Sequence, residues 1–282
     1  MMKIFKFKLD RKSLEIMYTT FVRPVMEYGI VVWGGTFDSN ILKLEQINVE
    51  ALRIITGATS RSNISHLYEE TSLPSFMDRR DRSMLIMLYK VKINIAPNYL
   101  INLLPNENRE NIHYNLRNNN HIRIPFARHE AYKRSFFPYA LKLWNTLSAE
   151  TQMLATVSEF KKHAICNNEA NILYYYGHRW GNIHHARLRI GCSQLNYDLF
   201  MNLHVIDSPK CKCGSPLETR MHFFMECPLF LDQRTKLFVD VSKLTNLNID
   251  FLLYGNDKLS LADNYHIFDA VHTYIKDTRR FE

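Results

Sequence analysis

The sequence predicts a mainly α-helical protein. Apolar residues recur near the 3.6-residue period of a helix through most of the 282 residues. Ser, Asn or Pro stand where several of these stretches begin, and Gly or Pro where they end, which is typical of helix termini. The composition, with 46% hydrophobic and 23% charged residues, is that of a globular chain. We divide the chain into four segments, 1–95, 96–150, 151–235 and 236–282.

Residues 1–95 are expected to be helical. The first helix covers 12–33, and Pro24 should kink or divide it because proline cannot donate the helical hydrogen bond. Three further helices follow, over 39–56, 62–71 and 74–93. In the last of them we expect the charged residues 78–82 to face solvent. The apolar residues expected on its buried face are Met84, Leu85 and Leu88.

Residues 96–150 are expected to form a basic, Asn-rich connector, in which Pro97, Pro105 and Pro125 break any helix before residue 130. Between positions 111 and 145, Lys and Arg outnumber acidic residues six to one, and aromatic residues are interleaved with them. Basic groups beside stacking rings are what a single-stranded nucleic acid requires. Arg117, Arg123 and Arg128 are therefore candidates for phosphate contact.

Further helices are expected in the second half of the chain. The spacing of Phe137, Ala140, Leu141 and Trp144 fits the buried face of a short helix rather than a stacking surface. Longer helical stretches are expected over 152–175, 229–245 and 262–279, and residues 185–205 are expected to be helical or mixed.

The net charge of +8 is concentrated in the middle of the chain. Residues 51–200 hold 19 Lys or Arg and 11 Asp or Glu, whereas the flanking parts nearly balance. A localised basic region favours a polyanionic partner such as RNA or DNA, bound with little sequence preference. The alternative is a solvated surface that only keeps the protein in solution.

Nothing in the sequence indicates a membrane or secretion. No apolar run approaches the ~18 residues that a membrane span needs, and the charged residues 1–8 do not resemble a signal peptide. Five cysteines, an odd number, argue against a disulfide framework. We therefore expect an intracellular protein, nuclear or cytoplasmic, that is not secreted.

The most specific chemical signal is a group of four potential metal ligands, Cys211, Cys213, His222 and Cys227. Three thiols and an imidazole at this spacing match a tetrahedral structural zinc site, and four protein ligands leave no open position for catalysis. His222 and Cys227 are five residues apart and do not share a face of an α-helix. The backbone between them must therefore leave α-helical geometry.

Two alternatives stay open for these residues. One of the four could be replaced by a spare ligand, namely Cys192, His184, His185 or His204. The other is that the three cysteines are buried or free thiols and His222 is an ordinary surface residue.

Sequence motifs of catalysis are missing. The sequence has no Asp-Asp pair, no Gly-rich phosphate loop, no G-x-S-x-G and no H-E-x-x-H. We therefore expect no enzymatic activity and no small-molecule substrate. The basic stretch 178–189 offers Arg187 and Arg189 as further phosphate contacts, or forms a solvated helix start.

Four stretches, 18–34, 44–58, 136–147 and 186–196, stand in this order ahead of the Cys-Cys-His-Cys motif. With them the chain resembles the C-terminal portion of non-LTR (LINE-like, jockey-type) retrotransposon reverse transcriptases, over about residues 12–235. The resemblance implies a thumb-like helical region in 1–95. It also implies a truncated fragment without the polymerase palm and its catalytic aspartates, and hence without activity of its own.

The resemblance further implies roles for individual residues. It assigns structural zinc to Cys211, Cys213, His222 and Cys227. It assigns contact with template or target to Arg79, Arg80, Arg82, Arg187 and Arg189. We thus expect a fragment that binds RNA or single-stranded DNA non-specifically. A domesticated or pseudogene-derived interaction module with no nucleic-acid role is the alternative, and an enzyme that uses the Cys/His cluster is a third.

Overall fold

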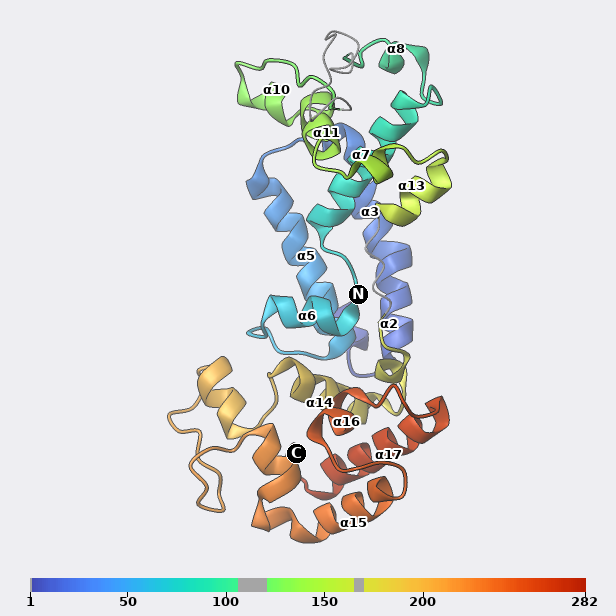
Figure 1. Ribbon diagram of the computed structural model, residues 1–282. Coiled ribbons are helices and arrows are strands. Elements are labelled where there is room, and N and C mark those ends of the chain that lie inside the picture. Colours follow the sequence, from blue (N-terminus) through green and yellow to red (C-terminus); the bar gives the residue numbers. More distant parts are fainter. Residues whose placement is uncertain (1, 106–120, 165–169) are drawn as a thin grey trace. The chain divides into compact units, whose positions relative to one another are not determined.

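A computed structural model describes residues 2–105, 121–164 and 170–282 (Figure 1). Within these ranges the protein is mainly α-helical and has no β-strand, as the sequence predicts. The chain divides into two units. Unit 1 comprises Met1–Phe21, Val49–Leu73 and Glu169–Glu282, and unit 2 comprises Val22–Asn48 and Pro74–Asn168. Each unit gathers distant segments, so the boundaries expected at 95, 150 and 235 do not coincide with this division.

The first predicted helix is a series of short helices. Its elements are α2 (Arg11–Met17), the π-helical η1 (Tyr18–Val22), α3 (Arg23–Glu27) and α4 (Ile30–Trp33). Pro24 lies in the first turn of α3, where its missing N–H costs no hydrogen bond, so the helix restarts there. Gly29, with a φ of 64°, then separates α3 from α4. The expectation that Pro24 kinks or divides this helix agrees with the break at η1.

Unit 2 is built on α7 (Phe76–Lys92), which packs against α4, α11 (Phe136–Trp144) and α13 (Val157–His163) (Figure 1). Ser75 and Asp78 form a reciprocal capping box that starts α7. The buried residues expected on α7 and α11 meet in one core, except that Phe137 is only partly buried against it. This core consists of Met84, Leu85, Leu88, Tyr89, Ile122, Ala140, Leu141, Trp144 and Phe160.

The charged start of α7 does not face solvent throughout. The expectation is wrong for Arg79 and Arg80, which are only 3% and 4% exposed. Arg79 donates to Glu27, and Arg80 donates to Asp81 (2.9 Å) and to the hydroxyl of Tyr139. Two of these three acceptors come from α3 and α11, far away in the sequence, so the periodicity of α7 alone could not indicate them.

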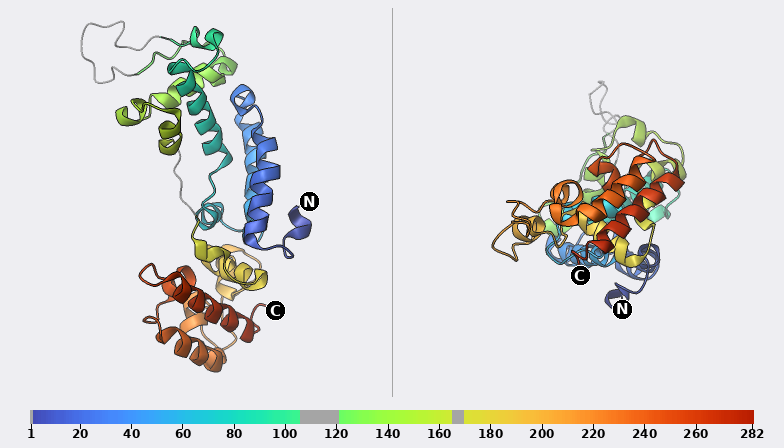
Figure 2. Two further views of the ribbon diagram at one scale, coloured as in Figure 1. Left: turned by 90° about the vertical axis from the view of Figure 1, so that its right-hand side faces the viewer. Right: turned by 90° about the horizontal axis from the view of Figure 1, so that it is seen from below.

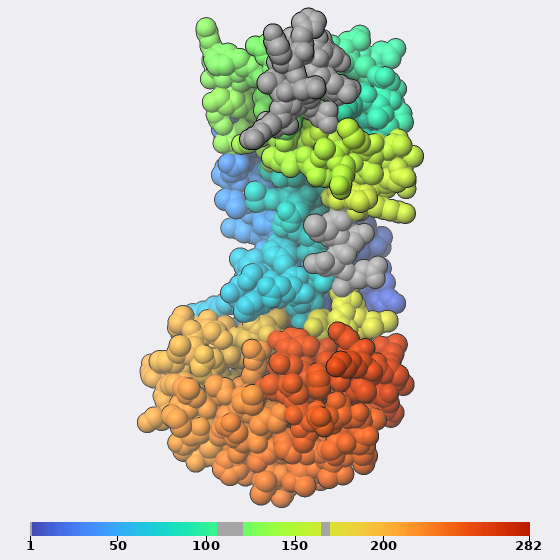
Figure 3. Space-filling model, viewed as in Figure 1, coloured from blue at the N-terminus to red at the C-terminus, as the bar shows by residue number. Residues whose placement is uncertain are grey.

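The connector expected over 96–150 contains the short helices α8 (Asn98–Ile101) and α10 (Glu130–Arg134) before α11 begins. Ile122 belongs to the core, whereas residues 123–134, green in Figure 3, are exposed or partly exposed. Beyond α11, the predicted helix over 152–175 is divided into α12 (Ala149–Gln152), α13 and the 3-10 turn η2 (Ile172–Tyr175).

Unit 1 has its core between α14 (Arg179–Ile190), α15 (Leu231–Ser242) and α17 (Leu261–Asp277). Figure 2 shows α15 and α17, in orange and red, side by side. These two helices agree with the predicted 229–245 and 262–279. Unit 1 also contains α2 and η2, together with α1 (Met2–Phe5), α6 (Ile64–Thr71), η3 (Asp198–Asn202), η4 (His222–Glu226), η5 (Pro228–Phe230) and α16 (Ile249–Tyr254). Helix α5 (Asp38–Thr56) has residues in both units.

No helix among the described residues is long and apolar enough to span a lipid bilayer. The longest is α5, with 19 residues, and its sequence carries charged residues in every turn or two. This agrees with the lack of a long apolar run in the sequence.

A buried acid joins three helices of unit 1. Glu70 of α6 is 5% exposed and accepts hydrogen bonds from Arg189 of α14 (2.8 and 2.7 Å) and from Arg11 of α2 (2.6 Å). Burial alone would raise the pKa of Glu70, but the two guanidiniums outweigh burial and hold the pKa below its ordinary value. The carboxylate therefore stays ionised in the interior.

His184 of α14 makes unit 1 sensitive to acid. Burial between Trp180 and Phe281, assisted by Arg187, lowers the pKa of His184 to about 4. The unfolded chain, with a histidine pKa near 6.5, binds a proton that the folded chain does not bind between about pH 6.5 and 4. Stability should therefore be lost as pH falls through that window.

Replacement of His184 by Phe should remove the loss of stability that protonation of His184 causes at acidic pH. We expect the free energy of unfolding to fall between pH 6.5 and 5 more steeply in the wild type than in His184→Phe, by up to about 1.4 kcal/mol per pH unit. Urea unfolding at several pH values measures both slopes. Equal slopes would show that the His184 pKa is not depressed.

Candidate metal centre

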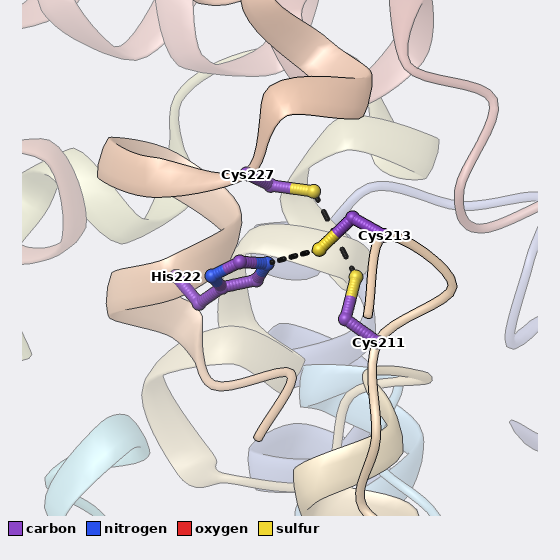
Figure 4. A group of neighbouring side chains, drawn as sticks. All are labelled: Cys211, Cys213, His222 and Cys227. Atoms are coloured by element: carbon purple, nitrogen blue, oxygen red, sulfur yellow. Dashed lines mark hydrogen bonds between the residues drawn. The ribbon is translucent and has the colours of Figure 1, made fainter. Parts of the chain in front are cut away.

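The four ligands predicted from the sequence converge in unit 1 (Figure 4). The three sulfur atoms and one imidazole nitrogen lie within 4.8 Å of one another. Sγ of Cys211 lies 3.7 Å from Sγ of Cys227, and Sγ of Cys213 lies 3.3 Å from Nε2 of His222. Cys213 is partly exposed and the other three residues are buried. This group could hold a metal ion.

A tight turn presents the first two sulfurs. The N–H of Cys211 donates to the carbonyl oxygen of Ser215 (2.9 Å), and the N–H of Gly214 donates to that of Cys211 (3.0 Å). Gly214 has a φ of 98°, in the left-handed region that favours glycine. The turn thereby brings Cys211 and Cys213 to the same side of the backbone.

The thiols differ in their ease of ionisation. The backbone N–H of Ser215 is the main cause that lowers the pKa of Cys213 to about 7. Burial raises the pKa of Cys211 and of Cys227. The partly exposed Cys213 is therefore the thiol that loses its proton first.

A π-helical turn presents the other two ligands. The N–H of Cys227 donates to the carbonyl oxygen of His222 (2.8 Å), the i to i+5 hydrogen bond of η4. A π turn contains more residues than an α turn, so two residues five apart come to the same side. The prediction that the backbone leaves α-helical geometry here is confirmed.

A carboxylate lies beside the imidazole of His222. Its Nδ1 lies 3.5 Å from Oε2 of Glu226, one α-helical spacing further along, while Nε2 points to the sulfur of Cys213. A metal-binding histidine commonly has its second nitrogen held by such an acceptor. Glu226 was not predicted from the sequence, although it stands four residues after His222.

The turn with Cys211 is anchored to the rest of unit 1 by a buried acid. Glu218, whose Oε1 is 3.9 Å from Sγ of Cys211, accepts two hydrogen bonds from Arg280 (2.7 and 2.6 Å). On the other side, Arg234 of α15 donates to the carbonyl oxygen of Cys227 (2.7 Å). Glu218 and Arg280 are 62 residues apart, so no local pattern in the sequence could have joined them.

The spare ligands considered from the sequence lie elsewhere. Cys192 is buried in a different apolar cluster, and His184 packs between aromatic rings. His185 is within hydrogen-bond distance of the carbonyl oxygen of Leu252 (2.9 Å), and His204 is exposed. Among the described residues, none of these four side chains belongs to the group in Figure 4.

The arginines expected to contact nucleic acid lie in three kinds of environment. The buried ones, held in the ion pairs described above, are Arg79, Arg80 and Arg189. The partly exposed ones are Arg82 and Arg187. The exposed ones are Arg123 and Arg128. Arg117 lies outside the described residues.

Comparison with known proteins adds no assignment: no protein family, no curated protein and no solved structure matches this chain. The chemistry of the four ligands and the exposure of the basic residues therefore carry the functional interpretation.

Proposed function

We propose that Cys211, Cys213, His222 and Cys227 bind one structural zinc ion. In a tetrahedral site with Zn–S of about 2.3 Å and Zn–N of about 2.0–2.1 Å, two sulfurs are about 3.8 Å apart, and a sulfur and a nitrogen about 3.5 Å. The 3.7 and 3.3 Å distances agree with that geometry to a few tenths of an ångström. With all four positions taken by the protein, the ion would stabilise the fold rather than activate water.

We also propose that the chain binds RNA or single-stranded DNA, as a non-catalytic C-terminal fragment of a LINE-like reverse transcriptase. Charge supports unit 2 as the part that binds. Its two segments hold 16 Lys or Arg and 10 Asp or Glu, a net +6 of the total +8. Excess positive charge in one unit attracts a polyanion without sequence preference.

The observation that carries the nucleic-acid proposal is the exposure of rings and arginines in 121–134. Phe126 is 86% exposed and Tyr132 is 46% exposed. Arg123 and Arg128 are exposed beside them in the sequence. The ring of Phe126 and part of that of Tyr132 are left open to solvent, and near guanidinium groups such rings suit bases that stack while phosphates are neutralised.

A fluorescently labelled single strand tests this proposal. We expect the logarithm of the affinity of the wild type to fall linearly with the logarithm of salt concentration. Arg123→Gln with Arg128→Gln should reduce that slope by about 0.7 for each lost phosphate contact. Phe126→Ala should cost about 1–3 kcal/mol of binding without a change of slope, because stacking releases no counterions.

A charge-matched control is Lys236→Gln with Lys258→Gln, two exposed lysines of unit 1. This variant should bind as the wild type does. A wild-type slope near zero would contradict the nucleic-acid proposal and favour an interaction module with no nucleic-acid role.

A further inference from the structure

Three cations of unit 1 meet at the C-terminal end of α5. Arg179 donates to two carbonyl oxygens within 54–58 (2.7 and 2.8 Å), and Arg187 and Lys6 each donate to one (both 2.9 Å). The last carbonyls of a helix have no partner within the helix and carry a partial negative charge. The three cations therefore cap this helix end from α1, α14 and the residues around them.

The positive charge at this helix end exceeds what the protein supplies to balance it. Among the described residues, no carboxylate forms an ion pair with any of the three cations. Glu50 is held by Lys3 (3.2 Å) and Arg53 (3.7 Å), and Asp10 accepts from the N–H of Ser13 as the cap of α2. A helix end contributes only about half a negative charge. Glu50 acts on Lys6 and Asp10 acts on Arg179 in the direction that raises the pKa, but burial and the neighbouring arginines outweigh them, so positive charge stays in excess.

The excess of positive charge is accompanied by lowered pKa values of the three cations. Burial, followed by the repulsion of neighbouring arginines, lowers the pKa of Lys6 and lowers that of Arg179 to about 10. Burial also lowers the pKa of Arg187. Buried charge without an opposite charge is costly, and an anion at this place would relieve that cost.

Arg187 and Lys6 are open to a ligand, whereas Arg179 is closed. Arg179 is buried, and its Nε and both terminal nitrogens donate to carbonyl oxygens. Arg187 is partly exposed, and its Nε alone has a hydrogen-bond partner among the described residues. The hydrogen bond from Nε to the carbonyl oxygen of Gly57 holds the guanidinium group in place. The two terminal nitrogens of Arg187 remain available for a bidentate contact. Phosphate oxygens fit such a contact.

We propose that Lys6, Arg179 and Arg187 form an anion site that takes one phosphate group of the bound strand. Arg187 and Lys6 contact the phosphate oxygens, and the buried Arg179 contributes positive charge without touching the phosphate. The proposal rests on the nucleic-acid binding proposed above. It adds a contact in unit 1, formed in part by the chain's first residues, to the contacts expected from residues 121–134.

Strand binding by Lys6→Gln and Arg187→Gln tests the site in the full-length protein. Each variant should lose several-fold affinity for every strand sequence and reduce the salt slope by about 0.7. Lys8→Gln, an exposed lysine two residues away, serves as the matched control and should leave both unchanged. Because Arg187 also caps a carbonyl, Arg187→Lys is added; it should keep the slope but bind more weakly.

Inorganic phosphate supplies an independent readout. At equal ionic strength, phosphate should raise the thermal midpoint of the wild type above its value in chloride, and Lys6→Gln should abolish that increase.

The combined results separate the two proposals. If the wild type binds strands and both glutamine variants keep its salt slope, the anion site is wrong while the proposed function stands. If the wild type binds no strand but phosphate stabilises it through Lys6, the site serves a free phosphate-bearing ligand and the proposed function fails. Loss of both effects overturns both proposals.

Discussion

Removal of zinc by a chelator at neutral pH should unfold the region around 211–227 and weaken the packing of α15 and α17 on it. The turn from Cys211 to Ser215 has only two backbone hydrogen bonds of its own, and its sulfurs would be left without the ion. Structural zinc in small domains contributes on the order of 10 kcal/mol of apparent folding energy. The loss should therefore be large.

Hydrogen exchange and circular dichroism before and after chelation measure this loss. Cys227→Ser should give the same result as chelation, since it removes a buried ligand. Cys192→Ala is the matched control, because Cys192 is also a buried cysteine but lies outside the four-ligand group. Exchange protection in 211–227 that survives both chelation and Cys227→Ser would contradict a structural role for the ion.

Replacement of Glu70 by Ala should cost about 3–5 kcal/mol, because it leaves two buried guanidiniums without their common acid. Arg11 and Arg189 both donate to this carboxylate, and both are buried. Glu70→Gln should lie between Ala and the wild type, since it keeps an acceptor oxygen and removes the charge.

The neighbouring Glu69 provides a matched control. Glu69 is exposed on the same helix, so Glu69→Ala should change stability by no more than about 0.5 kcal/mol. Urea unfolding of the two variants compares them directly. Similar losses of unfolding free energy in Glu70→Ala and Glu69→Ala would show that the buried ion pairs of Glu70 do not stabilise unit 1.

Local patterns in the sequence predicted local structure well. Helix α6 begins within the stretch 62–71 expected to be helical, and the side chain of Asn63 caps it by accepting a hydrogen bond from the N–H of Ser65. Met84, Leu85 and Leu88 are buried on α7 because a 3.6-residue period fixes which residues share a face. The five-residue spacing of His222 and Cys227 indicated a departure from α-helical geometry, which η4 provides.

Features that depend on contacts between distant segments were not predictable. Arg79, Arg80 and Arg189 stand in charged stretches typical of a solvated helix face, yet each donates to a partner about 50 to 120 residues away. The same holds for Glu218 and Arg280 beside the metal centre. A charged residue next in sequence to other charges gives no sign of a buried partner elsewhere.

The nature and number of the metal ligands are the most direct test of this account. X-ray absorption on the zinc-loaded, full-length protein should give one zinc per chain with three sulfurs at about 2.3 Å and one nitrogen at about 2.0–2.1 Å. A purified protein that retains no zinc, or a zinc ion surrounded mainly by oxygen, would contradict the structural site formed by Cys211, Cys213, His222 and Cys227.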